Sequence, residues 1–266
     1  MNTYPIGIFD SGLGGLTILK TIHKRLPHED LIYFGDTMNV PYGSKSKEAV
    51  TRFSLAIARF LEKQQVKLIV VACNTASALA LSQLQKQISV PIIGVIEPGA
   101  KKAFQTTRNN KIAILATEAT VRSLSYPKAL KKLNSKLQVT QQACPVFVPL
   151  IEEGWIHPVA SKQIIADYLR PVIKSGADTV VLGCTHYPVI KRYIAAQLNK
   201  NTKLIDSAEV LAEQAADYLA RTNALNTLGR GRLTLYASDD PSRFKKLARN
   251  IIGHSLPRVL LKKLIS

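Results

Sequence analysis

Short apolar segments alternate with longer amphipathic segments along most of the 266-residue chain. The apolar segments are rich in Val and Ile, which is typical of buried strands, and the segments between them have helical spacing. Strands are expected at 5–9, 31–35, 67–72, 91–95, 111–115, 137–141, 179–183, 203–205 and 232–237. One intervening segment, SKEAVTRFSLAIARFLEKQ, begins with Ser46, whose side chain can cap a helix by accepting a first-turn N–H. This alternation predicts an α/β fold with parallel sheets covered by helices.

Two pairs of segments indicate that the chain contains two similar halves. PIGIFDSG and KIAILATEATV are both apolar strands that end in a small polar turn, about 105 residues apart. VVACNTAS and VVLGCTHYP are both strands that end in Cys and polar residues, 111 residues apart. We therefore predict two pseudo-symmetric parallel-sheet α/β domains facing a central cleft, with a break near 96–103. Because ligands bind beyond the carboxyl ends of strands in open α/β sheets, Cys73 and Cys184 are expected to flank that cleft.

The positions of the three cysteines predict different roles for them. Cys73 and Cys184 each follow a strand and precede an expected helix. The free N–H groups and the dipole at a helix N-terminus stabilise an anion and so lower the pKa of a thiol. Cys144, in QQACPVFVP, lacks this setting and is expected to be a small buried apolar residue.

Four chemistries use a pair of thiols in a cleft, and the sequence leaves all four open. A zinc site would combine Cys73, Cys184, His186 and a fourth ligand, although the sequence has no CxxC knuckle. A disulfide and a Cys–His hydrolase with His186 as base are two others. The fourth is proton transfer at carbon, in which one acid/base group on each face of a substrate removes and returns a Cα proton. That reaction needs two similar groups, as a repeated half provides.

Polar residues near the other strand ends are candidates for the same cleft. In FDSGLGG, Asp10 can orient or deprotonate a neighbouring group, and Ser11 can donate to a carboxylate; helix capping is the simpler alternative. The loop GDTMNVPYG can hold an anion through its backbone N–H groups. In PLIEEGW, Glu152 or Glu153 can support a histidine.

The charge of the chain favours acidic partners. Lys and Arg number 36 against 18 Asp and Glu, which gives a formal net charge of +18. The basic segment 243–266 would suit nucleic acid, whereas a solvated lysine-rich surface is the simpler interpretation. Three cysteines are few for a disulfide scaffold, and we recognise neither a signal peptide nor an apolar run of the roughly 20 residues that span a bilayer. We therefore expect a cytoplasmic protein without membrane association.

Seven motifs together resemble one enzyme family. FDSGLGG, GDTMNVPYGSKS, VACNTASA, PIIGVIEPGA, PVFVPLIEEG, LGCTHYP and LIDSA occur in the order and at the spacings of glutamate racemases, across roughly residues 5–210. Members of that family interconvert L- and D-glutamate without pyridoxal phosphate, metal or another cofactor, and supply D-glutamate for bacterial peptidoglycan synthesis. The resemblance implies a discontinuous first domain, 1–97 and 208–266, and a second domain, 98–207.

The resemblance also implies a role for each site residue. Cys73 and Cys184 would be the two acid/base residues, one for each face of Cα. Asp10 would assist Cys73, His186 would assist Cys184, and Glu152 would support His186. The residues that would hold the charged groups of the substrate are Asp10, Ser11, Tyr42, Gly43, Asn74, Thr75, Thr185 and His186.

The sequence departs from the family at one place. Glu118-Ala119 stands where the family usually has Pro-Gly, between Thr117 and Thr120. An acidic residue there either weakens the binding of a carboxylate or points outward, and it puts contact by Thr117 and Thr120 with the substrate in question.

Other functions and partners remain to be separated by experiment. The competing enzymes are a racemase of the same superfamily acting on aspartate, and a Cys-dependent hydrolase or lyase. The resemblance further implies a homodimer and permits a secondary contact with DNA gyrase or DNA.

Overall fold

The strands form two parallel sheets in the computed structural model, which describes residues 3–156, 159–253 and 256–264. The strands of the first sheet are β1 (Ile6–Asp10), β2 (Leu31–Gly35), β3 (Leu68–Val71), β4 (Ile92–Gly94), β9 (Leu233–Ala237) and β10 (Val259–Leu261). The strands of the second sheet are β5 (Lys111–Ala116), β6 (Gln138–Ala143), β7 (Thr179–Gly183) and β8 (Lys203–Asp206). All nine strands expected from the sequence are present, and β10 was not predicted.

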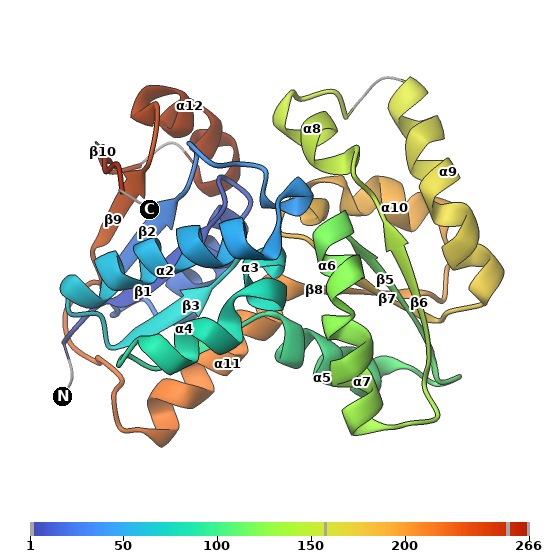
Figure 1. Ribbon diagram of the computed structural model, residues 1–266, viewed down its shortest axis with the longest axis horizontal. Coiled ribbons are helices and arrows are strands. Elements are labelled where there is room, and N and C mark those ends of the chain that lie inside the picture. Colours follow the sequence, from blue (N-terminus) through green and yellow to red (C-terminus); the bar gives the residue numbers. More distant parts are fainter. Residues whose placement is uncertain (1–2, 157–158, 254–255, 265–266) are drawn as a thin grey trace.

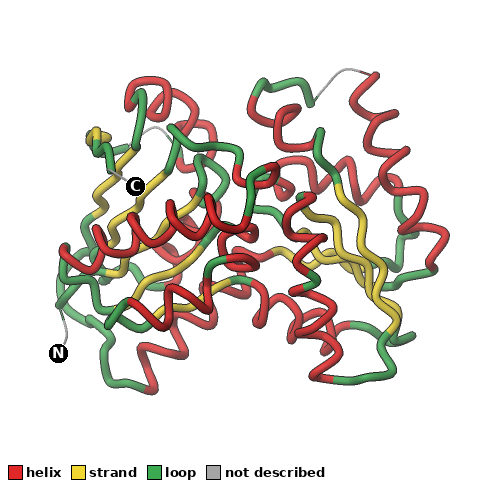
Figure 2. Tube along the Cα trace, in the orientation of Figure 1, coloured by secondary structure: helices red, strands yellow, loops and turns green. Residues whose placement is uncertain are grey.

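Helices connect the strands and cover the sheets (Figure 2). Those in the first part of the chain are α1 (Leu16–Arg25), α2 (Lys47–Lys63), α3 (Asn74–Leu79), α4 (Leu81–Gln87), α5 (Ile96–Thr106), α6 (Glu118–Ser123) and α7 (Ser125–Leu133). They are followed by α8 (Phe147–Glu152), α9 (Val159–Ser175), α10 (Lys191–Gln197), α11 (Ser207–Arg221) and α12 (Pro241–Ile252). Two 3-10 helices, η1 (Tyr42–Ser44) and η2 (Tyr187–Ile190), lie in loops. Ser46 caps α2 as predicted, since its hydroxyl accepts the Ala49 N–H at 3.2 Å. None of the helices in the described ranges is long and apolar enough to cross a membrane.

The strand order confirms the two similar α/β halves. The first sheet has the order β10-β9-β2-β1-β3-β4 and the second has the order β6-β5-β7-β8. The run β2-β1-β3-β4 therefore corresponds to β6-β5-β7-β8. This correspondence pairs β1 with β5 and β3 with β7, the same pairs that the sequence repeat indicated. Figure 1 shows the two halves side by side, with α3 and α6 facing each other between them.

A buried apolar cluster runs beneath both sheets and joins the halves. It includes Ile8 of β1 and Ile114 of β5, together with Ala100 of α5 and Leu211 of α11, all of them buried. Helices α5 and α11 pack against each other below the gap between the two sheets in Figure 1. This continuous core packs the two halves against each other.

The chain returns to the first half after β8. Strand β9 pairs with β2, and β10 extends the sheet by pairing with β9. A buried ion pair between Lys67 and Glu29, 2.6 Å long, anchors the returning segment, because Lys67 donates to the carbonyl of Ala224 and Glu29 accepts the N–H of Asn226. This strand membership supports the division into 1–97 with 208–266 and 98–207, which stays a prediction.

Candidate active site

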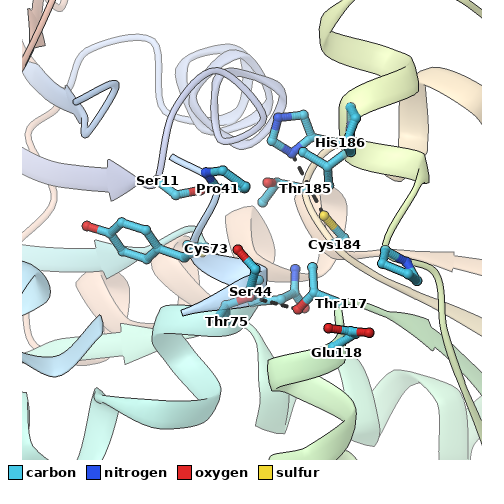
Figure 3. Close-up of a pocket in the computed structure, with 16 residues that line it drawn as sticks. Ser11, Pro41, Ser44, Cys73, Thr75, Thr117, Glu118, Cys184, Thr185 and His186 are labelled. Carbon is cyan, nitrogen blue, oxygen red and sulfur yellow. Dashed lines mark hydrogen bonds between the residues drawn. The ribbon is translucent and has the colours of Figure 1, made fainter. Parts of the chain in front are cut away.

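The carboxyl ends of the central strands enclose one pocket between the two halves. Its polar and sulfur-bearing wall is formed by Ser11, Tyr42, Ser44, Cys73, Asn74, Thr75, Thr117, Glu118, Cys184, Thr185 and His186. Pro41, Gly43, Pro145, Val148 and Pro149 complete it. In Figure 3 Cys73 and Ser11 project from the first half, and Cys184 and His186 approach from the second. The pocket thus brings together both thiols that the sequence placed at equivalent strand ends.

Cys73 is buried at the point where the chain leaves β3 for α3. It is the N-cap residue of α3, and its sulfur accepts the Ala76 N–H at 3.5 Å. Burial and the nearby Asp10 carboxylate nevertheless raise the pKa of Cys73 to about 12, although the hydrogen bond from Ala76 acts in the opposite direction. The sequence argument that a helix N-terminus lowers the pKa is therefore wrong for Cys73, because desolvation outweighs one hydrogen bond. At neutral pH Cys73 is a thiol and can act as a proton donor.

Cys184 begins a row of three side chains in the second half. Its sulfur lies 3.8 Å from Nδ1 of His186, and Nε2 of His186 lies 3.0 Å from Oε1 of Glu152. Burial lowers the pKa of His186, but the hydrogen bonds to Cys184 and Glu152 and the charges of Cys184 and Asp10 outweigh it and raise the pKa to about 10. His186 is therefore an imidazolium at neutral pH, and both ring nitrogens donate. Its Nδ1–H is placed to exchange a proton with the Cys184 sulfur.

Only one member of the acidic pair in PLIEEGW takes part in this row. Glu152, at the end of α8, contacts His186, whereas Glu153 lies 3.9 Å from Arg243 of α12 and both of those side chains are exposed. The local sequence left either carboxylate possible, and the family resemblance selected Glu152, which is the one that contacts His186.

Asp10 connects the first half to the loop that carries Cys184. One of its oxygens accepts the Gly12 N–H at 3.0 Å and the other accepts the Thr185 hydroxyl at 3.3 Å. Burial raises the pKa of Asp10, while the neighbouring His186 charge and these hydrogen bonds work against the rise. Gly14 allows the close approach, since a Cβ on it would lie 2.3 Å from Oγ1 of Thr185. The glycines of FDSGLGG thus let the two halves meet beside both thiols.

Asn74, Thr75 and two threonines of the second half form a second contact between the halves. The Thr75 hydroxyl lies 2.9 Å from that of Thr117 and 3.3 Å from that of Thr120. Asn74 is buried, its Oδ1 accepts the Tyr126 hydroxyl at 2.8 Å, and its Nδ2 is buried without a hydrogen-bond partner. The pocket therefore contains hydroxyls and an amide N–H that are available to a polar ligand.

Asp36 orients the loop that carries Tyr42 and Gly43, and sequence reasoning missed it. The buried Asp36 carboxylate accepts hydrogen bonds from the Tyr42 hydroxyl at 2.5 Å and from Ser238 at 2.8 Å. Burial and the Asp36 charge raise the pKa of Tyr42 well above its usual value, so Tyr42 remains a neutral donor. The position of Asp36 directly after β2 was a signal, because polar residues at strand ends mark the ligand edge. Ser238, 202 positions away, gave no such signal.

Glu118, the departure from the family pattern, lines the pocket but is also open to solvent. Its side chain is 46% exposed, and its carboxylate lies 3.9 Å from the Arg122 guanidinium one helical turn away. Thr117 and Thr120 are buried and face Thr75. The acidic residue therefore leaves the threonine cluster in place and adds a negative charge to the wall of the pocket.

Two of the alternatives for the thiols, a disulfide and a zinc site, are not supported by the geometry of the described residues. All three cysteines are free thiols. Among the residues that the structure describes, no group of three or more His, Cys, Asp or Glu side chains could hold a metal ion, as the zinc alternative requires. Cys144 is buried as expected, and its sulfur faces the Gln142 carbonyl at 3.6 Å.

Comparison with known proteins shows the family of the chain and agrees with its two-domain α/β fold. The chain belongs to the Asp/Glu/Hydantoin racemase family, whose sequence model matches residues 14–215. A glutamate racemase of Geobacter metallireducens is 49% identical to it over 94% of this chain and 93% of its own. A glutamate racemase isoform from Bacillus anthracis superposes with a TM-score of 0.96 at 35% identity, over 99% of both chains. The Francisella tularensis glutamate racemase in complex with D-glutamate gives a TM-score of 0.93 at 34% identity, over 99% of this chain and 98% of that one.

Proposed function

We propose that this protein is a glutamate racemase that interconverts L- and D-glutamate by proton transfer between two cysteines, and so supplies D-glutamate for peptidoglycan synthesis. The observation that carries the proposal is the presence of Cys73 and Cys184 in one pocket, each at the end of the equivalent strand of its half. A planar carbanion intermediate can be protonated from either face, so a racemase needs an acid/base group on each side. The repeated half supplies both.

The reaction is a pair of proton transfers. The sulfur on one side, as thiolate, takes the Cα proton, and the electron pair of the broken C–H bond remains on the substrate carbanion. The thiol on the other side then gives its proton to the opposite face of Cα. The two sulfurs end with exchanged protonation states, and the reverse reaction uses them in the opposite order.

The surroundings of the two sulfurs suit them to these roles. Cys73, with its pKa raised to about 12 by burial and by Asp10, is held as a thiol and gives a proton. The His186 imidazolium accompanies the Cys184 sulfur and can compensate negative charge on it. Asp10 acts on the Cys73 side, and Glu152 keeps His186 charged. Because the pocket is buried, these fixed groups act with little competition from water.

The substrate's charged groups are assigned to polar groups around the thiols. The first half contributes Ser11, Tyr42, Gly43, Asn74 and Thr75 to the pocket wall, and the second half contributes Thr185. Asp10 and His186 complete the set that the family resemblance implied. Thr117 joins this set through its hydrogen bond to Thr75.

The test is proton NMR of the purified protein with L-glutamate in D2O, without added cofactor, accompanied by a circular-dichroism trace. Racemisation predicts loss of the Cα proton signal together with optical rotation that falls toward zero. Loss of neither signal with glutamate but both with aspartate would assign the chain to the competing aspartate reaction. A covalent adduct on one thiol without exchange would instead favour a hydrolase or lyase.

Two partner expectations also stay proposals. A homodimer is tested by light scattering coupled to size exclusion, for which a mass of one 29.2 kDa chain is the contrary result. Contact with DNA gyrase or DNA is suggested by the basic segment 243–266, which includes most of α12. Direct contact with DNA predicts retention on DNA that falls steeply with salt, because counterions are released on binding.

A further inference from the structure

Tyr126 of α7 lies beneath the pocket and contacts elements next to both thiols. Its side chain is fully buried, and its hydroxyl donates to Oδ1 of Asn74, the residue that follows Cys73. Its ring lies close to Gly183, the residue that precedes Cys184, since a Cβ on Gly183 would be 3.2 Å from ring atom Cε2. Tyr126 is not part of the pocket wall, so its effect on a ligand must pass through another residue.

Asn74 is the residue through which that effect passes. An asparagine amide has an acceptor side and a donor side, and the two are hard to distinguish by shape alone. Here the acceptor side is engaged by Tyr126, which leaves the donor Nδ2 buried and unpaired in a residue of the pocket wall. An unpaired buried donor is unfavourable, and a ligand acceptor in the pocket would relieve it.

We propose that Tyr126 is a positioning residue for substrate binding: its hydroxyl holds the Asn74 amide so that Nδ2 donates to an acceptor oxygen of the bound amino acid. This inference rests on the proposed function, because it assigns the ligand as an anionic amino acid. With the amide reversed, Oδ1 would face the substrate and repel a carboxylate oxygen.

The packing of Tyr126 makes this orientation rigid. A Cβ on Gly99 of α5 would lie 3.3 Å from the Tyr126 hydroxyl, so the residue is enclosed between α5 and β7. Tyr126 belongs to the second half and Asn74 to the first. The hydrogen bond therefore forms only when the two halves are packed together, and it makes the donor available in the assembled pocket.

The test is steady-state racemisation by Tyr126→Phe, which removes the hydroxyl and keeps the ring. We expect KM for L- and D-glutamate to rise about tenfold, the scale of one hydrogen bond, with kcat changed less than about twofold. Asn74→Ala should raise KM at least as much. The double variant Tyr126→Phe/Asn74→Ala should be no worse than Asn74→Ala, because the hydroxyl has no amide left to orient.

Tyr187→Phe is the matched control. Tyr187 is equally buried in the same half, and its hydroxyl donates to the Cys144 carbonyl at 3.1 Å instead of to a pocket side chain. Tyr187→Phe should lower the midpoint of thermal unfolding about as much as Tyr126→Phe does. Its effect on KM should add to that of Asn74→Ala.

A second variant tests the donor without touching Tyr126. Asn74→Asp keeps the shape and the acceptor for the tyrosine but replaces Nδ2 by an oxygen, and we expect KM to rise more than tenfold. An unchanged KM in Asn74→Asp or Tyr126→Phe, or additive effects in the double variant, would overturn the inference while leaving the racemase function intact. A wild-type protein without exchange or racemisation of glutamate would overturn both.

Discussion

The Cys184 sulfur lies 3.8 Å from Nδ1 of His186, and the far side of the same ring is 3.0 Å from Glu152. No equivalent cation accompanies Cys73 among the described residues that line the pocket, and its sulfur is instead affected by the Asp10 carboxylate. The two thiols are thus equivalent in the fold but differ in their electrostatic surroundings. This difference leaves Cys73 beside a carboxylate and Cys184 beside an imidazolium.

Cys73→Ser and Cys184→Ser should each abolish two-way racemisation, with losses of at least about 10²-fold, because a serine hydroxyl is too weak an acid to replace a thiol in proton transfer. Racemisation in both directions is measured by circular dichroism, and Cα exchange by NMR in D2O. Cys144→Ser is the matched control and should remain active, since Cys144 is buried outside the pocket wall. Robust two-way turnover in either site variant would contradict the two-base mechanism.

Glu152→Gln should move the alkaline limb of the activity profile to lower pH. Burial lowers the pKa of His186, and the hydrogen bonds to Cys184 and then to Glu152 are the largest interactions that raise it to about 10. Loss of a neighbouring negative charge lowers the pKa of a cation by about one unit or more. The measurement is kcat/KM between pH 7 and 10 for the wild type and the variant.

Glu153→Gln serves as the control for that shift. Glu153 is the adjacent glutamate, but its carboxylate faces Arg243 and both of those side chains are exposed. The alkaline limb of kcat/KM for Glu153→Gln should coincide with that of the wild type. The same displacement in both variants would mean that general surface charge, not the contact with His186, sets the pH dependence.

Stability should fall as pH rises between about 6.5 and 10, because of His186. The folded-state pKa of His186 is raised above the ordinary value, so the folded protein binds this proton more tightly than the unfolded chain. The contribution of this proton to the free energy of unfolding is complete below about pH 6.5 and is lost as pH rises through the folded-state pKa near 10. Urea unfolding of the wild type and His186→Gln at pH 6 and 8.5 measures it. We expect the wild type to lose more unfolding free energy over this interval than the variant, and parallel losses would refute the assignment.

Glu118→Gln should lower KM for glutamate by about two- to fivefold at low salt, because it removes a partly exposed negative charge from the pocket wall. Arg122→Gln should have the opposite effect, since it leaves Glu118 without its ion-pair partner. Both effects should shrink as ionic strength rises. The test compares KM at two salt concentrations. A KM that is the same in all three proteins would place the Glu118 carboxylate too far from the substrate to matter.

The sequence by itself determined nine of the ten described strands and the positions of the two thiols. Buried strands such as β3 and β7 are continuous apolar runs. The run itself marks the strand in the local sequence, so the bounds could be predicted within about two residues. The repeat of a thiol after β3 and after β7 predicted two similar halves, because equal order and spacing in one chain give equal topology. Ser46 at the start of α2 was predictable for the same reason, since a cap acts within its own first turn.

Tertiary structure alone decided which side chains meet. Strand β10 has only three residues and exists through pairing with β9, so the local pattern could not reveal it. The local pattern left Glu152 and Glu153 open and only the family resemblance selected Glu152, because the contact with His186 depends on the direction in which each side chain projects from the end of α8. The raised pKa of Cys73 depended on burial and on Asp10, 63 positions earlier (73 − 10). The hydrogen bond between Tyr126 and Asn74 joins residues 52 positions apart in different halves. Such contacts require the packed core that brings the halves together, and neither periodicity nor capping contains that information.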